Sequence, residues 1–261
     1  MLCVVVVMGV TQLHDVVYIV CFKSSTILRF NATTHQRLTD IDVKDLRWPL
    51  DIVACEQMSL LYVADNAVCV WRVSADGADI KRWWSKSSSD TFRPCTLSVT
   101  STRLLVTSDY GTNQLLQLDA GGDELRRVQL PGDMTDLQHA VESPTGTFII
   151  SHKNTQLEQD QVSEVNTDGK VLRQFTGSRL SSLGWTPHVA IDSHGNIFLA
   201  DYHNHHILLL DAQLTPRRVI VDQHQLNDKP PWRLCYREPT GQLLVGLYQQ
   251  NSVLVFDVLR R

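Results

Sequence analysis

The sequence predicts an all-β fold, a single six-bladed β-propeller of four-stranded antiparallel blades, and three observations support this prediction. Short runs of apolar and β-branched residues recur along all 261 residues at a period of about 45 residues, and six periods fit the chain. Nearly every period holds four such runs, separated by the Gly, Pro, Asn and Asp residues that form hairpin turns. No long helical pattern interrupts them. Four short strands per repeat of this length are typical of a propeller blade.

Two of the four runs set the period independently of each other. The first reads VYIVC in its earliest copy, and its six copies end at Cys21, Asp65, Asp109, His152, Asp201 and Leu247. The second reads ILRFN in its earliest copy, and its copies end at Asn31, Ser74, Asp119, Asn166, Asp211 and Asp257. Both series give the same spacing. We therefore predict one domain over 1–261, with blades at approximately 1–46, 47–91, 92–135, 136–184, 185–229 and 230–261.

The other two runs complete the four-stranded unit. One precedes the first run and reads LDIVAC (50–55), CTLSVT (95–100), HVAID (188–192) and RLCYR (233–237). The other follows the second run and reads DIKRWW (79–84), LRRVQL (125–130), VLRQF (171–175) and RRVIV (217–221). Their content of Val, Ile, Leu and aromatic residues predicts strands.

The two ends of the chain fit the repeat less well. The last period stops at VFDVLRR, which leaves no room for a fourth strand. A closed propeller hides the edges of its sheets, so the last blade is expected to be incomplete or to be closed by an N-terminal strand from LCVVVV (2–7). The same residues could instead form the first strand of blade one, and they are too few for both roles. This conflict predicts that the chain is a piece of a longer protein.

Composition excludes some classes of protein. The 24 basic and 28 acidic residues give a net charge of −4, which does not favour DNA binding. The apolar start is too short to span a membrane and lacks the flanks of a signal peptide, so no membrane partner is expected. The six cysteines are scattered among apolar neighbours without a Cys-x-x-Cys pair, which predicts buried reduced thiols and a cytoplasmic location.

One segment, LADYHNHHILLLD (199–211), contains three histidines and could be read as a metal site. The longer stretch PHVAIDSHGNIFLADYHNHHILLLD (187–211) resembles an NHL repeat, with matches at Pro187, Val189, Ala190, Asp192, Gly195, Asn196, Ala200, Asp201, Asn204, Ile207 and Asp211. The stretches WPLDIVA and LYVADN of blade two, and RPCTLSV of blade three, match as well. The histidines therefore belong to a repeated hairpin whose aspartate is expected to accept backbone N–H bonds. We expect no metal and no cofactor.

The resemblance implies a binding face, formed by the loops that enter each first strand and those between second and third strands. Trp, Tyr and Arg are common anchors of protein interfaces, although a tryptophan here can equally pack between blades. The candidate partner-binding residues are Trp48, Arg93, Tyr110, Lys153, Trp185, His188, Tyr202, His203, Trp232, Arg233 and Tyr248.

Two function classes remain open. The resemblance to NHL propellers, such as the C-terminal module of TRIM-type RING/B-box proteins, implies a non-enzymatic scaffold that recognises a protein, as in a ubiquitin-ligase substrate module, or single-stranded RNA. Mixed charge on the predicted face favours protein. The alternative is a metal-dependent hydrolase or lyase with ligands in the central channel. The positions expected at the channel mouth are Asp51, Thr96, His139, His188 and Leu234, of which three could bind a metal.

Blade four carries an insertion, HKNTQLEQDQ (152–161), which lengthens its period to 49 residues. We expect a solvated loop there.

Overall fold

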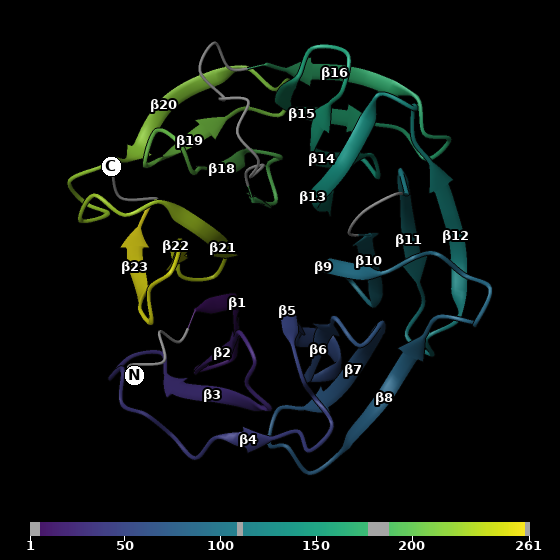
Figure 1. Ribbon diagram of the computed structural model, residues 1–261. Coiled ribbons are helices and arrows are strands. Elements are labelled where there is room, and N and C mark those ends of the chain that lie inside the picture. Colours follow the sequence, from purple (N-terminus) through teal and green to yellow (C-terminus); the bar gives the residue numbers. More distant parts are fainter. Residues whose placement is uncertain (1–5, 109–111, 177–187, 259–261) are drawn as a thin grey trace.

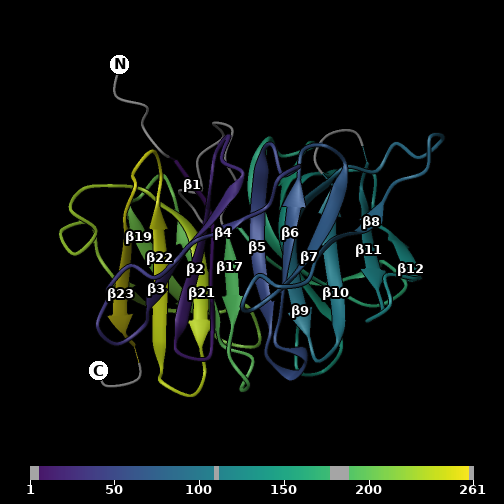
Figure 2. The same cartoon turned by 90° about the horizontal axis from the view of Figure 1, so that it is seen from below.

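The protein is a ring of six antiparallel β-sheets around a central channel, as seen in a computed structural model that describes residues 6–108, 112–176 and 188–258 (Figure 1). Each sheet is built from strands that are consecutive in sequence, and the strands run between the two faces of the disc (Figure 2). The predicted all-β propeller with six blades is therefore confirmed.

The first three blades each contain four strands, ordered from the channel outward. Blade one consists of β1 (Val7–Leu13), β2 (Val16–Cys21), β3 (Thr26–Asn31) and β4 (Ile41–Asp42). Blade two consists of β5 (Pro49–Cys55), β6 (Leu60–Asp65), β7 (Cys69–Ser74) and β8 (Ile80–Ser85). Blade three consists of β9 (Pro94–Thr100), β10 (Arg103–Ser108), β11 (Gln114–Leu118) and β12 (Glu124–Gln129).

The last three blades follow the same order, but the final one has three strands among the residues that the structure describes. Blade four consists of β13 (Met134–Glu142), β14 (Phe148–Asn154), β15 (Gln159–Val165) and β16 (Val171–Phe175). Blade five consists of β17 (Val189–Ile191), β18 (Ile197–Asp201), β19 (His206–Leu210) and β20 (Pro216–Val221). Blade six consists of β21 (Pro231–Arg237), β22 (Gln242–Leu247) and β23 (Val253–Asp257).

The hydrophobic core is divided among the spaces between neighbouring blades. Because successive side chains of a strand point to opposite faces, each blade packs apolar side chains against both of its neighbours. Between blades one and two, for example, Tyr18 and Ile52 are almost fully buried, and the Tyr18 hydroxyl donates a hydrogen bond to the carbonyl of Ala75. Burying a side chain of this size contributes on the order of 1.5–3 kcal/mol, so repetition around the ring stabilises the whole disc.

Short polar turns join the strands, and their sequences explain their shape. In the turn between β15 and β16, the Asn166 side-chain oxygen accepts hydrogen bonds from the backbone N–H groups of Asp168 and Lys170. Gly169 in that turn has φ +84°, and a Cβ there would lie 1.9 Å from the carbonyl oxygen of Gln129. Only glycine fits this position.

The structure resolves the conflict at the two ends of the chain. β1 pairs with β2 as the inner strand of blade one, so it does not complete blade six. The prediction that the last blade is incomplete is confirmed for the described residues. Closure by an N-terminal strand is not seen among them, and residues 2–5 of the segment expected for that role lie outside the described residues. The two blades meet through apolar packing, in a cluster that includes Val7, Val10 and Leu244, and through hydrogen bonds such as that from the Val7 N–H to the carbonyl of Gln250 at 3.3 Å.

The extra residues of blade four do not form the expected solvated loop. β14 and β15 are both lengthened, and His152, Lys153 and Asn154 pair with Gln161, Asp160 and Gln159 across the ladder. The polar side chains of His152 and Asn154 are buried, and the turn itself covers only residues 155–158. The loop prediction was wrong because these polar side chains satisfy one another inside the sheet, as Asn154 does with Gln161.

Other sequence predictions can be compared with the described residues. Five cysteines are described, none of them forms a disulfide, and three are buried. One short 3-10 helix, η1 (Glu56–Met58), lies between β5 and β6. No helix in the described ranges is long and apolar enough to cross a membrane.

Candidate functional site

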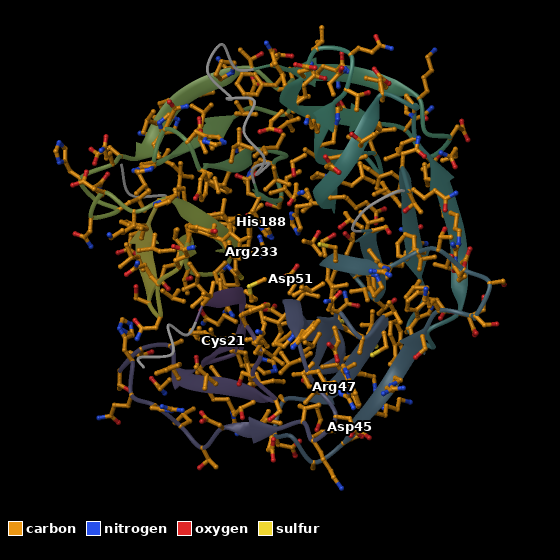
Figure 3. The ribbon with its side chains drawn as sticks, viewed as in Figure 1. Cys21, Asp45, Arg47, Asp51, His188 and Arg233 are labelled. Atoms are coloured by element: carbon orange, nitrogen blue, oxygen red, sulfur yellow. The ribbon has the colours of Figure 1, made fainter. Side chains whose placement is uncertain are left out.

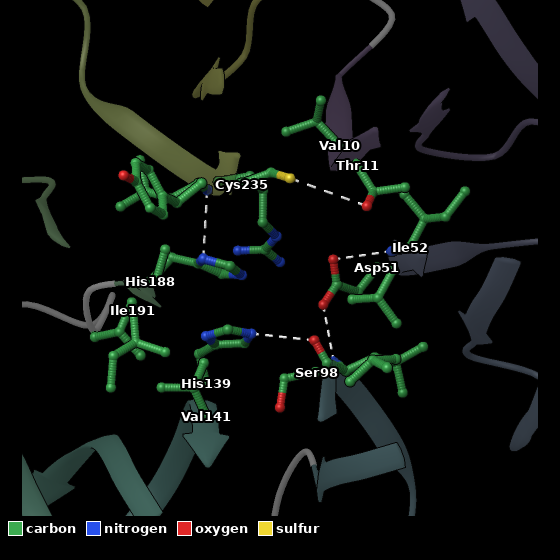
Figure 4. A pocket seen from close by; sticks show the side chains of 18 of the residues that line it. Val10, Thr11, Asp51, Ile52, Ser98, His139, Val141, His188, Ile191 and Cys235 are labelled. Atoms are coloured by element: carbon green, nitrogen blue, oxygen red, sulfur yellow. Dashed lines mark hydrogen bonds between the residues drawn. The ribbon is translucent and has the colours of Figure 1, made fainter. Parts of the chain in front are cut away.

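Four polar side chains from different blades converge on the central channel, where Asp51, His188 and Arg233 lie around the opening and His139 completes the group (Figures 3 and 4). Together with apolar side chains of the inner strands they line a cavity of about 180 Å³. The strand register shifts immediately before three of them, between Pro49 and Asp51, Thr135 and His139, and Pro231 and Arg233. Such bulges redirect a side chain, and here they accompany side chains that line the channel.

Asp51 is held by backbone donors from two blades. Its Oδ1 accepts a hydrogen bond from the N–H of Ile52 at 2.9 Å, and its Oδ2 accepts one from the N–H of Leu97 at 2.9 Å (Figure 4). Burial raises the pKa of this carboxyl to about 6, and the nearby Arg233 guanidinium and the two N–H groups limit the rise. The carboxylate thus links β5 of blade two to β9 of blade three.

His139 and His188 stack on each other beside Asp51. Their ring centroids are 3.6 Å apart and the planes differ by 20°. His139 Nε2 lies 3.1 Å from the carbonyl of Leu97, so this nitrogen carries the proton, and the buried Nδ1 has no hydrogen-bond partner among the described residues. Burial lowers the pKa of His139 to about 4 and holds the pKa of His188 well below its ordinary value, so both rings are neutral at pH 7.

His188 has the opposite arrangement of protons. Its Nδ1 accepts a hydrogen bond from the N–H of Leu234 at 3.3 Å, which places the proton of the neutral ring on Nε2. This buried Nε2 finds no acceptor in the described part of the chain. The pair therefore presents one free acceptor, on His139, and one free donor, on His188.

Arg233 is buried, with 7% of its surface exposed, and joins three blades. Its Nε donates to the carbonyl of Met8 at 2.6 Å and its Nη2 donates to the carbonyl of Leu50 at 3.4 Å. Its guanidinium also lies 4.6 Å from the Trp232 ring. Arg233 was predicted to lie on an exposed binding face, but its side chain fills the channel wall between blades six, one and two.

A metal ion could use three of these groups, because ligand atoms of Asp51, His139 and His188 all lie within 4.8 Å of one another. His139 is prepared for this role by its bond to Leu97. His188 is not, because a cation at Nε2 would require the proton to move to Nδ1 and would break the bond from Leu234. Arg233 adds a further positive charge. The arrangement as it stands better fits a small polar molecule that both donates and accepts a hydrogen bond.

The other two residues expected at the channel mouth do not join this group. The Thr96 hydroxyl is used in hydrogen bonds with the Thr107 hydroxyl and the carbonyl of Gln138, each at 2.8 Å. Leu234 is part of the apolar core of blades five and six. Of the five positions predicted there, Asp51, His139 and His188 come together.

A cluster of aromatic rings lies over blades five and six, on the face where the inner strands begin. Tyr202 and His203 come from the turn between β18 and β19, Tyr248 follows β22, and Trp232 lies in β21. Tyr202 packs 5.2 Å from Tyr248 and 6.2 Å from Trp232, and Trp232 packs 5.1 Å from Tyr248. His203 packs 5.2 Å from Tyr202. Trp232 is buried and the other three rings are half-buried.

The histidine-rich segment forms a hairpin turn, as predicted. Asp201 Oδ1 accepts the N–H of Asn204 at 3.1 Å, and its Oδ2 accepts the Asn204 side-chain amide at 2.7 Å. His206 Nε2 lies 3.3 Å from the same carboxylate. The equivalent Asp65 accepts the N–H groups of Trp48 and Ala67, which confirms the repeated role of this aspartate.

Three of the remaining predicted site residues lie on separate blades. Trp48 and Arg93 are exposed at the entries to β5 and β9, and Lys153 is half-buried in β14. Tyr110 and Trp185 lie outside the described residues. The aromatic cluster therefore unites four of the eleven candidates, and His188 and Arg233 belong to the channel below.

A buried acidic residue that the sequence did not indicate, Asp160, lies near Asp201, the residue before Tyr202 of the aromatic cluster. Burial raises the pKa of Asp160 to about 6, nearby Lys153 limits the rise, and the carboxylates of Asp136 and Asp201 increase it. The sequence could have indicated this contact only if β14 and β15 had been recognised as long strands. Asp160 then pairs with Lys153 across the two strands.

Comparison with known proteins supports the fold and assigns no family. No family model matches the chain, and no curated protein matches it. Kuenenia stuttgartiensis hydrazine synthase aligns with TM-score 0.69 at 15% identity, over 96% of this chain and 83% of that one. A catalytically inactive H270A virginiamycin B lyase from Staphylococcus aureus, with quinupristin, aligns with TM-score 0.69 at 12% identity, over 94% and 78%. A chain of a nidogen/laminin complex aligns with TM-score 0.66 at 14% identity, over 85% and 82%. At these identities the likeness shows the propeller fold alone.

Proposed function

We propose that this propeller is a non-enzymatic binding scaffold that presents the face with the aromatic cluster to a protein partner. The observation that carries the proposal is the packing of Tyr202, His203 and Tyr248 around Trp232, with three half-buried rings. Rings that are fixed by one another lose little conformational entropy when a partner covers them, and Tyr and Trp are frequent interface anchors.

The sequence resemblance to NHL repeats supports the same role. It implies a propeller that recognises protein or single-stranded RNA, and a substrate-recognition module of a TRIM-like ubiquitin ligase is the form we propose. Free cysteines fit the reducing conditions of the cytoplasm, where such modules act. Nidogen/laminin is a protein complex in which a similar fold occurs.

Protein is a better ligand for this face than RNA because of the charges beside the cluster. Asp136 and Asp201 lie close enough to Asp160 to raise its pKa, and Lys153 lies close enough to limit the rise. A phosphate backbone needs a basic surface, and carboxylates at this position would repel it. A basic or amphipathic segment of a protein would instead be attracted.

The hydrogen bonds of the channel favour a scaffold over a metal-dependent hydrolase or lyase. Asp51, Arg233 and one nitrogen of each histidine are already engaged with backbone groups of neighbouring blades. These bonds join neighbouring blades, which is a structural role. A substrate-binding role would require the free nitrogens of His139 and His188.

Site-specific photocrosslinking tests the proposed face. A photoreactive phenylalanine analogue replaces Tyr248 in cells, and the same analogue replaces Thr145, which is exposed in the turn between β13 and β14 on the opposite face, as the control. We expect discrete protein adducts from position 248 and none from position 145. Tyr202→Ala should reduce the adducts at least about tenfold, because losing an interface anchor costs on the order of 2 kcal/mol.

Three other results would redirect the assignment. Adducts that disappear on ribonuclease treatment would establish RNA as the ligand. Equal adducts from positions 248 and 145 would contradict a specific face. A stoichiometric Zn²⁺ or Ca²⁺ ion in the purified protein that is lost in His139→Gln would support the metal-dependent enzyme.

A further inference from the structure

The outer edge of blade six is the least complete part of the ring. In each of the other five blades the third strand pairs with a fourth, whereas β23 pairs only with β22 among the described residues. Its sequence, Val253-Leu254-Val255-Phe256-Asp257, is mostly apolar, and Val255 is 39% exposed. A flat apolar edge with unpaired backbone groups is a template for another strand.

Two hollows of about 260 Å³ each border this edge. The first lies between blade six and blade one and is lined by Val253 and Val255 on one side and by Val17, Ile19 and Phe30 on the other. The second lies between the end of β23 and β20 of blade five, and it is lined by Asp257, Val258, Val219 and Arg218. Val219 is 47% exposed there.

The positions of the hollows match the geometry of a missing strand. Successive side chains of a strand point to opposite faces of its sheet. A fourth strand beside β23 would therefore place alternate side chains toward blade one and toward blade five. Because both sides are hollow, side chains of ordinary size can be accommodated without moving either neighbour.

The charge of the edge indicates the chemistry of the incoming strand. In blade five, Asp211 at the end of the third strand pairs with Arg217 of the fourth at 2.6 Å. In blade four, Glu164 pairs with Arg173 in the same way. Asp257 occupies the place of Asp211 in the repeat and is exposed. A basic residue near the start of the added strand would complete the pattern.

We propose that an extended basic and apolar segment of a partner protein binds in trans as the fourth strand of blade six, antiparallel to β23. This site is separate from the aromatic cluster and does not depend on its proposed role.

A second copy of the chain fits less well than an extended segment. Blade six is one strand narrower than its neighbours, so its edge lies about one strand spacing, ~4.8 Å, inside their outer strands. Two such recessed edges would be kept apart by the neighbouring blades of both copies. A single flexible strand can enter the gap, whereas a folded sheet edge cannot.

The repeat supplies a probe for this site. A fluorescent peptide with the sequence of residues 214–222, LTPRRVIVD, is the fourth strand of blade five and should pair with β23 as it pairs with β19. We expect saturable binding of this peptide to the purified protein in a fluorescence anisotropy titration. Val255→Asp in the protein and Arg217→Glu in the peptide should each weaken binding at least tenfold.

A matched control and a grafted variant complete the test. Leu172→Asp changes a leucine that is 46% exposed on β16 of the complete blade four, and it should leave peptide binding unchanged. A variant in which residues 212–221 replace 258–261 should melt at a higher temperature and no longer bind the peptide. If the peptide does not bind, the proposal is wrong. This holds even if the graft raises Tm, because a fourth strand would then close the edge only as part of the same chain. The photocrosslinking at position 248 tests the face with the aromatic cluster, and its outcome does not depend on peptide binding or on the graft.

Discussion

Asp160 is a buried carboxylate whose pKa makes a testable prediction at the scale of one residue. Burial and the neighbouring acids raise its pKa to about 6 from an ordinary value of 3.8, so the folded state disfavours the ionised form. Stability associated with this group is therefore present below pH 4 and lost as pH rises through 6. Asp160→Asn should raise the free energy of unfolding by about 3 kcal/mol at pH 7.5, from about two pKa units at 1.36 kcal/mol each, and by almost nothing at pH 4. Urea denaturation at both pH values measures the difference, and an equal effect at both would show that ionisation is not the cause.

Individual side chains also show what the sequence could predict of the site and what it could not. The repeat period placed Asp51, His139 and His188 together at the channel, because equivalent positions of equivalent strands must meet around a ring. It could not show that His188 Nδ1 accepts a hydrogen bond from Leu234, or that Arg233 turns inward to Met8. Those facts depend on bulges in the inner strands, whose only trace in the sequence is the proline two residues before Asp51 and before Arg233.

At the scale of the strand, β1 approaches β5 so closely that one position must be glycine. A Cβ on Gly9 would lie 2.6 Å from the backbone nitrogen of Ile52 and 2.9 Å from Asp51 Oδ1. Gly9→Ala should therefore separate the two inner strands and lower the free energy of unfolding by about 1–3 kcal/mol. Gly132→Ala is the matched control, because nothing lies within 4 Å of a Cβ there, and it should change stability by less than about 1 kcal/mol. A loss in Gly132→Ala as large as that in Gly9→Ala would contradict crowding against β5 as the cause, because the entropic effect of Gly→Ala alone stabilises the folded state.

The strands themselves were predictable where apolar residues alternate or run together, as in LYVAD and ILLLD. They were not predictable where polar side chains are buried. β14 and β15 continue through His152, Asn154 and Gln161 because these side chains bond to one another and to Ser163 and Thr176. A prediction based on hydrophobic periodicity therefore assigns two such polar strands to a loop.

At the scale of the whole molecule, closure of the ring depends on contacts between blades six, one and two. The repeat period predicted the number of blades. It did not predict that blades six and one close the ring without sharing a β-sheet, which the structure shows. Arg233 binds the carbonyls of Met8 and Leu50 and compensates the charge of Asp51. It is the buried cation at the junction of blade six with the first two blades.

Removing that cation should therefore open the ring locally before the rest of the disc unfolds. Arg233→Met keeps much of the side-chain volume but leaves two buried carbonyls and a buried carboxylate uncompensated, which should cost about 3–5 kcal/mol. Hydrogen exchange should increase most in β1 and β21, and less in β14 and β15 of blade four, which lies opposite blade one in the ring. Arg103→Met, at an exposed arginine of β10, is the control and should cost less than about 0.5 kcal/mol. Uniform exchange throughout the ring would show that the blades unfold as one unit and that Arg233 does not hold a separate junction.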